Sequence, residues 1–182
     1  MPDSQNQEQA RLRPHRDYKG FEGSVKAVTG KTLVIGSKLY GNPDRRALYT
    51  DAIGLDMQPG DGVDIVHDLE YPLEGQYDHI DCSSVLEHVQ RPWLMAANIE
   101  ALLKPGGKLL VCAPFVWRTH GYPNDYWRFS LESFRILFPG IEWVEAHYIT
   151  DHGICDRVPG SKPDGVTHMM RAEAAAFGFK PA

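Results

Sequence analysis

The sequence lacks the long apolar run that a membrane-spanning helix requires. None of its apolar stretches approaches the roughly 18–20 consecutive residues that cross a bilayer. The amino terminus, from Met1 to Arg16, is polar and has no apolar segment of the kind that secretory signals carry. We therefore expect no membrane partner and a cytoplasmic location.

Cysteine and clustered positive charge are also scarce. The three cysteines, Cys82, Cys112 and Cys155, are far apart and form no C-x-x-C pair, so neither a cysteine zinc site nor a redox motif is indicated. The net charge is −5 and there is no long basic run. Because binding to nucleic-acid phosphates needs clustered lysine and arginine, a nucleic-acid partner is not expected.

What is present is the composition of an ordinary globular protein, 42% hydrophobic and 24% charged over 182 residues. This length fits one domain with a substantial core. Residues 1–20 are polar, and we expect a flexible arm there, or else a flap over an active site. Residues 21–182 are expected to form a single domain, and nothing in the sequence indicates an oligomeric state.

Short apolar runs recur at regular intervals and predict strands. Because they are continuous rather than alternating, we expect strands buried on both faces, as in a parallel sheet. A more alternating run predicts an edge strand over 141–149, and the tail from His168 is expected to hold a short helix and a final strand near 177–179. The continuous runs are residues 32–35, 52–55, 63–66, 77–82 and 108–113.

Helical patterns lie between these runs and predict helices over residues 43–49, 92–103 and 131–138. Asn42 and Ser130 stand where the first and third helices need an N-cap, and Pro43 and Pro92 stand at first helical positions. Gly106-Gly107 is expected to end the second helix. Alternating strands and helices predict an α/β fold, a doubly wound Rossmann-like and mostly parallel sheet.

Ligands of such sheets bind beyond the carboxyl ends of the strands, so the residues that follow the runs are candidates. Gly36 would let the backbone approach a ligand closely, although a tight turn also explains it. Asp56 follows twenty positions later and could accept hydrogen bonds from ribose hydroxyls, or be a solvated acid. Asp68 could accept from the adenine amine beside the Leu69 amide, or simply cap a turn.

The glycines do not complete a phosphate-binding motif. Asn42 stands where a P-loop needs lysine, and Lys38 stands where G-x-G-x-x-G needs its middle glycine. A dinucleotide pyrophosphate is therefore poorly accommodated, which disfavours an NAD-dependent oxidoreductase.

Small residues follow the fourth predicted strand, where Ser83 and Ser84 leave room for a bulky ligand. Glu87 and His88 come next, and His88 could act as a general base near neutral pH or order the loop. Glu87 and His88 could also contact a metal, but two adjacent ligands are too few, and we predict no metal site.

The loop over residues 116–128 contains several aromatic residues and His120, the second candidate base. The aromatic residues could form a wall against a substrate, or pack the loop down, and Arg118 and Arg128 could hold an anionic acceptor. The candidate substrate-binding residues are Trp117, Tyr122, Asp125, Tyr126 and Arg128.

Several segments together resemble the successive motifs of class I S-adenosylmethionine-dependent methyltransferases, in particular the methyltransferase type 11 group. They are TLVIGS, GLDM, VHDLE, CSSVLEHV and LLKPGGKLLVCAPF, and the run HGYPNDYWRFS is similar to a stretch in one branch of that group. The resemblance covers residues 31–140 and implies methyl transfer with S-adenosylmethionine as cofactor.

The resemblance also implies a part of the cofactor for each matching position. Gly36 and Ser37 would line the methionine, Asp56 and Met57 would hold the ribose and flank the adenine, Asp68 and Leu69 would read the adenine edge, and Ser83 and Ser84 would approach the sulfonium.

Two features depart from the family pattern. The family usually has glycine where Lys38 stands, and the chain after Phe138 is short, so we expect an abbreviated C-terminal part. Without an inserted substrate domain, a small-molecule substrate or an exposed group is favoured. The same departures leave a non-catalytic partner module as the alternative.

Overall fold

The computed structural model describes residues 21–121, 123–150 and 172–182. The described strands are β1 (Lys31–Ile35), β2 (Asp51–Asp56), β3 (Ile65–Val66), β4 (Tyr77–Ser83), β5 (Leu103–Val116), β6 (Glu142–Thr150) and β7 (Ala172–Phe179). The described helices are α2 (Glu22–Lys26), α3 (Pro92–Leu102) and α4 (Leu131–Leu137), with 3-10 turns η2 (Arg45–Leu48) and η3 (Leu86–His88).

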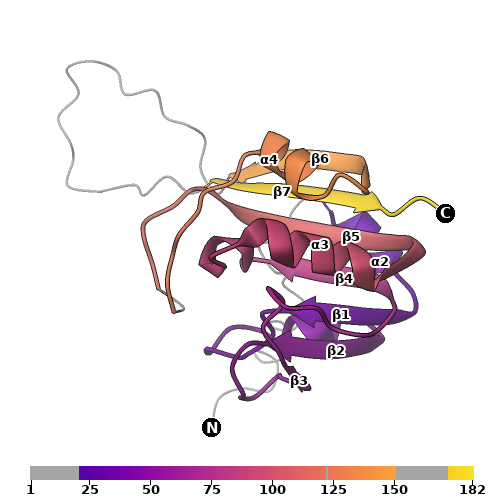
Figure 1. The fold of residues 1–182 in the computed structure, drawn as a ribbon, viewed down its shortest axis with the longest axis horizontal. Helices are drawn as coiled ribbons and strands as arrows, with labels where there is room; N and C mark the ends of the chain where they lie inside the picture. Colours follow the sequence, from indigo (N-terminus) through magenta and orange to yellow (C-terminus); the bar gives the residue numbers. More distant parts are fainter. Residues whose placement is uncertain (1–20, 122, 151–171) are drawn as a thin grey trace, which may run out of the picture.

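These strands form one sheet in the order β3-β2-β1-β4-β5-β7-β6 (Figure 1). β1 to β5 run parallel to one another, whereas β7 lies antiparallel between β5 and β6. The chain moves outward from β1 to β3 and resumes at β4 on the other side of β1. This reversal between β1 and β4 is the topological switch point of a doubly wound fold, and it confirms the predicted fold class.

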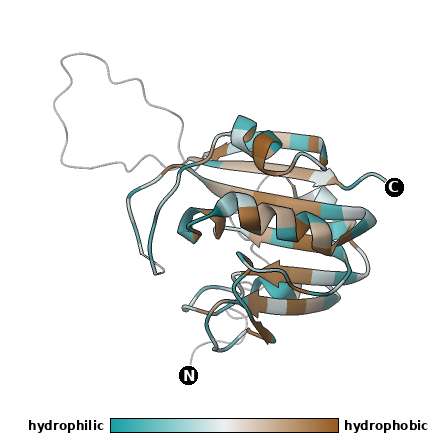
Figure 2. Cartoon of the chain, in the orientation of Figure 1, coloured by the Kyte–Doolittle hydropathy of each residue, from teal (hydrophilic) through white to brown (hydrophobic). Residues whose placement is uncertain are grey.

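Apolar layers cover both faces of the sheet. Helices α3 and α4 lie on one face (Figure 1). Their residues Ile99 and Phe134 belong to the larger core. On the other face, Phe21 and Val25 of the α2 region and Tyr49 pack against the central strands. Figure 2 shows hydrophobic residues along these central strands, as expected for strands buried on both sides.

The helix predicted over residues 43–49 is wrong. Only the short turn η2 forms, and its N-cap is Asp44, whose side chain accepts from the backbone N–H of Arg46; Asn42 does not cap it. The physical reason is Arg45, whose buried side chain enters the sheet and hydrogen-bonds to strand-end carbonyls.

The second helix ends at Leu102, and Gly106, with a φ of +76°, lies within β5 rather than ending a helix. Residues 104–107, which separate the predicted helix from the predicted strand, are therefore part of β5. Ser130 does cap α4, since its side chain accepts from the backbone N–H of Ser133. The predicted edge strand corresponds to β6.

The C-terminal part is short, as expected, yet it provides both strands of the final antiparallel pair. β7 covers Ala172–Phe179, so a helix within these residues is not formed and the strand is longer than predicted. The predicted arm over 1–20 and the tail residues 168–171 lie outside the described residues. Within the described ranges, no helix is long and apolar enough to span a membrane.

Candidate functional site

The carboxyl ends of β1, β2 and β4 lie side by side at the switch point. Ile35, at the end of β1, is paired with Leu55 of β2 on one side and with Cys82 of β4 on the other. Gly36 and Asp56 therefore leave adjacent strands at the same edge of the sheet, as a shared ligand requires.

Gly36 is constrained by its backbone and by its neighbour. Its φ is +67°, and a Cβ there would lie 2.5 Å from Cγ2 of Val85. A larger residue would have to adopt an unfavourable conformation and displace the loop after β4. The turn and this close packing account for the glycine, and its predicted contact with the cofactor remains a prediction.

Asp56 is half-buried and anchors the loop that follows β1. Its Oδ2 accepts from the backbone N–H of Lys38 at 3.2 Å, and its Oδ1 accepts from that of Gln58 at 2.9 Å. A carboxylate offers about four lone-pair positions. Each oxygen therefore keeps acceptor capacity beyond these two bonds.

The Lys38 side chain lies along the loop between β2 and β3. Its Nζ donates to Oε1 of Gln58 at 3.1 Å and stands 5.3 Å from the centroid of the Tyr40 ring. A Cβ at Gly60 would come within 2.9 Å of the Lys38 Cε, so the two segments are in close contact. The positive charge is thus engaged by Gln58, which follows β2, and by Tyr40 of the loop after β1.

The serines predicted near the methionine and sulfonium differ in hydrogen bonding and in backbone conformation. Ser37 is buried, and its Oγ has no hydrogen-bond partner among the described residues. The Ser83 hydroxyl donates to Asp81 at 2.7 Å, so it is directed back along β4. Ser84 has a φ of +55°, an unusual conformation for a non-glycine residue, directly after β4.

The residues predicted around adenine lie after β2 and β3. Met57 is 52% exposed, which leaves a free apolar surface beside Asp56. The Asp68 carboxylate accepts from the backbone N–H of Glu70 at 2.9 Å, so it caps a turn. The Leu69 side chain is buried in the core, and its carbonyl accepts from Asn98.

Arg45 is the principal residue that sequence reasoning missed. Its guanidinium donates to the carbonyls of Ile35 and Gly36 at the end of β1 and to the carbonyl of Ser83 at the end of β4. It also pairs with Asp81 at 3.3 Å. This one side chain therefore bridges the two strand ends at the switch point.

The partner of Arg45 belongs to a buried polar network. Asp81 is fully buried and accepts from the Tyr49 hydroxyl at 3.0 Å, and that hydroxyl lies 3.4 Å from Nε2 of His79. Burial lowers the pKa of His79 to about 4. His79 and Asp81 alternate within an apolar strand, and this period of two was the available signal that one face of β4 carries a polar network.

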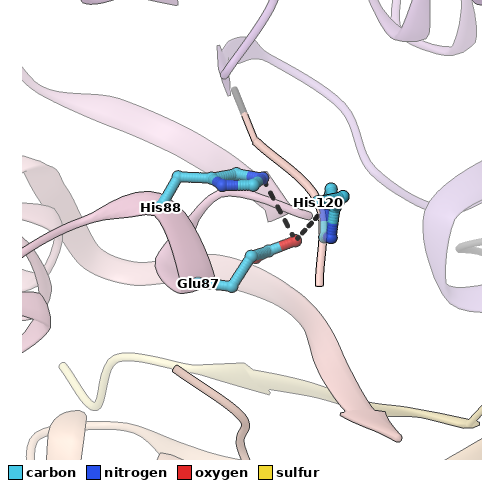
Figure 3. Close-up of side chains that lie close together, drawn as sticks. All are labelled: Glu87, His88 and His120. Atoms are coloured by element: carbon cyan, nitrogen blue, oxygen red, sulfur yellow. Dashed lines mark ion pairs between the residues drawn. The ribbon is translucent and has the colours of Figure 1, made fainter. Parts of the chain in front are cut away.

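Both predicted base candidates come together around Glu87 (Figure 3). Glu87 and His88 belong to η3, and His120 comes from the loop after β5. The distance from the Glu87 Oε1 is 3.6 Å to Nε2 of His88 and 4.0 Å to Nε2 of His120. The Glu87 side chain is only 1% exposed, and the two rings meet edge to face.

The other ring nitrogen of each histidine has its own acceptor. Nδ1 of His88 lies against the carbonyl of Asn124, and Nδ1 of His120 lies 3.3 Å from the Arg118 carbonyl and 3.0 Å from the Asp125 carboxylate. Burial lowers the pKa of His88, so this imidazole is neutral at pH 7. Its Nε2 can then accept a proton.

Asp125 and Arg128 fasten the loop that carries His120. Their side chains form a two-pronged ion pair, and hydrogen bonds from Arg128 hold the pKa of Asp125 well below its usual range. Arg128 also donates to the carbonyls of Trp117 and Arg118. These contacts give both residues a role within the loop, and their predicted contact with substrate remains a prediction.

The aromatic residues of this loop are only partly packed. The Trp117 side chain is half-buried, and Tyr126 is 42% exposed, with its hydroxyl accepting from Gln90. The backbone N–H of Tyr126 donates to the Glu87 carbonyl at 2.7 Å, which ties the loop to η3. Tyr122 lies outside the described residues.

Comparison with known families gives one match that spans most of the chain. The family described as "Methyltransferase domain" matches residues 12–150. No curated protein sequence matches the chain.

Several solved structures share the fold. The N-methyltransferase NodS from Bradyrhizobium japonicum WM9 in complex with S-adenosylhomocysteine is 14% identical, with 94% of this chain and 91% of that chain covered and a TM-score of 0.57. The 1,6-didemethyltoxoflavin-N1-methyltransferase from Burkholderia thailandensis is 12% identical, with 99% and 82% covered and a TM-score of 0.59. A complex of the Haloferax volcanii Trm112 methyltransferase activator with a protein described as a methyltransferase gives 17% identity, 92% and 90% coverage and a TM-score of 0.62. Identities this low show the fold alone.

Proposed function

We propose that this chain, which belongs to the methyltransferase domain family, transfers a methyl group from S-adenosylmethionine to a small molecule or to an exposed group on a larger one. The observation that carries this proposal is the meeting of Gly36 and Asp56 on adjacent strand ends at the switch point. In doubly wound sheets this is the place where an adenosine-containing ligand lies.

The residues present fit the adenosine part of the cofactor. The Asp56 carboxylate is held by two backbone N–H groups and has capacity for the two ribose hydroxyls. The exposed side chain of Met57 offers an apolar face beside it for adenine. Asp68 and Leu69 would follow around the adenine edge.

The methionine part would be held beside Arg45. The carbonyls of Gly36 and Ser83 already accept from the guanidinium, and each carbonyl keeps a second lone pair for the methionine ammonium. The negative charge of Asp81 balances the guanidinium, which reduces its repulsion of a sulfonium. Less acceptor capacity remains at these carbonyls than at Asp56, yet it is enough for the methionine ammonium.

The cofactor supplies an activated methyl group, and the protein supplies position and proton transfer. His88 and His120 are the proposed bases. Their Nδ1 atoms face backbone carbonyls and, for His120, the Asp125 carboxylate, so a proton on Nδ1 would make Nε2 the proton-accepting atom. An oxygen acceptor needs such a base, whereas a neutral amine does not.

The second candidate function is a non-catalytic partner module. The observation that favours it is again Arg45, because its guanidinium already occupies the strand-end carbonyls that a ligand ammonium would use. A structural relative is described in complex with a methyltransferase activator, so partner assemblies occur with this fold.

Thermal unfolding with S-adenosylmethionine, S-adenosylhomocysteine or NAD separates these functions. A ligand at 100 times its dissociation constant stabilises the folded state by about 2.7 kcal/mol, which raises the melting temperature by several degrees for a chain of this size. We expect a shift with the two adenosylated sulfur compounds and none with NAD. No shift with any of them supports the partner module, and a shift with NAD alone supports an oxidoreductase.

A further inference from the structure

We propose that Glu87, His88 and His120 bind a divalent transition-metal ion through Oε1 of the carboxylate and Nε2 of each ring. One ligand atom from each of the three residues lies within 4.8 Å of the others, and Figure 3 shows both rings beside the Glu87 carboxylate oxygen. The sequence alone predicted no metal site because Glu87 and His88 are only two ligands. The third ligand is brought by the loop after β5.

The outward ring nitrogens are arranged as in metal-binding histidines. Such a histidine donates its other N–H to a carbonyl or carboxylate, which fixes the ring and leaves the ligating nitrogen deprotonated. Here Nδ1 of His88 faces the Asn124 carbonyl, and Nδ1 of His120 faces the Asp125 carboxylate at 3.0 Å. Both Nε2 atoms therefore face Glu87. With the ion bound they would be its ligands, so the base roles proposed above for His88 and His120 belong to the metal-free protein.

The three donor groups of this cluster suit a cation. Two Nε2 lone pairs and a carboxylate are all electron donors, and the Glu87 side chain is 1% exposed, so water screens it little. A metal ion would be bound by all three groups at once.

The observed spacing is close to that of a tetrahedral site. Zinc binds nitrogen and oxygen ligands at ~2.1 Å, which sets ligand atoms ~3.4 Å apart in a tetrahedron. The distances from Glu87 Oε1 to the two ring nitrogens are 3.6 and 4.0 Å, and no separation within the cluster exceeds 4.8 Å, so movements on the order of 1 Å would close the site.

The composition of the site selects the class of metal. Two imidazoles and one carboxylate suit zinc, iron or cobalt, whereas magnesium and calcium prefer oxygen ligands alone. The side chains of His88 and His120 are 12% and 20% exposed, which leaves access for water or another exogenous ligand in the open positions. Three protein ligands with an open position are typical of catalytic rather than structural sites.

The backbone holds the two halves of the site together without metal. The N–H of Tyr126 donates to the Glu87 carbonyl, and the Trp127 indole N–H donates to the Val89 carbonyl at 2.9 Å. These bonds attach the loop to η3 on either side of His88. The ligands are thus presented by a preformed scaffold, which lowers the cost of binding.

Titration of untagged, metal-free protein with Co²⁺, followed by visible absorption and calorimetry, tests this site. We expect one Co²⁺ per chain, displaced by Zn²⁺. His120→Ala and His88→Ala should each weaken Co²⁺ binding by at least about tenfold, the lower bound seen even for outer-shell changes. His67→Ala, which removes a histidine outside the cluster, should bind Co²⁺ normally.

Two results would overturn the site: no saturable Co²⁺ spectrum in the unaltered protein, or an unchanged spectrum in His120→Ala. Circular dichroism of each variant establishes that it is folded. The thermal shift with S-adenosylhomocysteine, measured on the same metal-free samples, reports cofactor binding separately. A cofactor shift without Co²⁺ binding would refute the metal site and leave the proposed methyl transfer standing. Co²⁺ binding without a cofactor shift would support the metal site and count against methyl transfer.

Discussion

A buried guanidinium joins the two strand ends between which a cofactor would lie. Arg45 and Asp81 are 9% and 0% exposed, so their ion pair is shielded from water and held by backbone carbonyls of β1 and β4. Replacing one residue of such a pair leaves the charge of the other buried and uncompensated. Removing both charges together is far less costly.

Arg45→Met should therefore lower the free energy of unfolding by about 3–5 kcal/mol. Asp81 would still accept from the hydroxyls of Tyr49 and Ser83 but would lose its cationic partner. Chemical denaturation monitored by circular dichroism measures the effect. The double variant Arg45→Met/Asp81→Leu should recover much of the stability. A single variant as stable as the parent would show that the ion pair contributes little.

Asp56 carries the second prediction at the residue scale. Asp56→Ala should weaken S-adenosylhomocysteine binding by roughly ten- to a hundredfold, because hydrogen bonds to a charged group contribute about 1.5–3 kcal/mol. Isothermal calorimetry measures this. Asp51→Ala, at the exposed opposite end of β2, is the matched control and should bind normally. Equal affinities for the two variants would mean that the ribose lies elsewhere.

At the scale of elements, features with a local cause were predictable from the sequence. Ser130 caps α4 through its own side chain, and the strand ends at Gly36 and Asp56 follow from local apolar runs. Elements that depend on distant contacts were not predictable. η2 replaces a helix because Arg45 enters the sheet, and the alanine-rich β7 is a strand because β5 and β6 flank it.

The α4 cap gives an element-scale prediction. Ser130→Ala removes the side-chain acceptor of the Ser133 N–H and should lower stability by about 1 kcal/mol. The melting temperature measures the loss. Ser130→Asp retains an acceptor and places a negative charge at the helix start, so it should be close to the parent. If alanine and aspartate behave alike, the cap does not stabilise α4.

At the scale of the whole molecule, the order and spacing of the motifs were enough to identify the class I methyltransferase fold and family, which the family match and the sheet order confirm. The prediction of S-adenosylmethionine as cofactor agrees with the family match and with the sheet order. The candidate site was only partly predictable. His88 and His120 lie 32 positions apart in the sequence, and no local pattern indicates that the loop after β5 folds back onto η3.

The network beneath the switch point couples the stability of the whole molecule to pH. Burial lowers the pKa of His79 from 6.5 to about 4, with Nδ1 against the Lys108 carbonyl and Nε2 near the Tyr49 hydroxyl. The unfolded chain takes up the proton near pH 6.5 and the folded chain only near pH 4. Between these values the unfolded state binds more protons, so stability is complete above pH 6.5 and falls as the pH decreases.

One histidine shifted this far accounts for about 3 kcal/mol between pH 7 and pH 4, at about 1.4 kcal/mol per pKa unit. Denaturation at several pH values should show this loss in the parent. His79→Gln, which keeps hydrogen-bonding groups but cannot be protonated, should show a shallower decline over the same range. His88 also has a lowered pKa and contributes equally to both proteins, so it cancels in the comparison. Parallel curves for the two proteins would mean that His79 is protonated in the folded state already near pH 6, and that the network accommodates its charge.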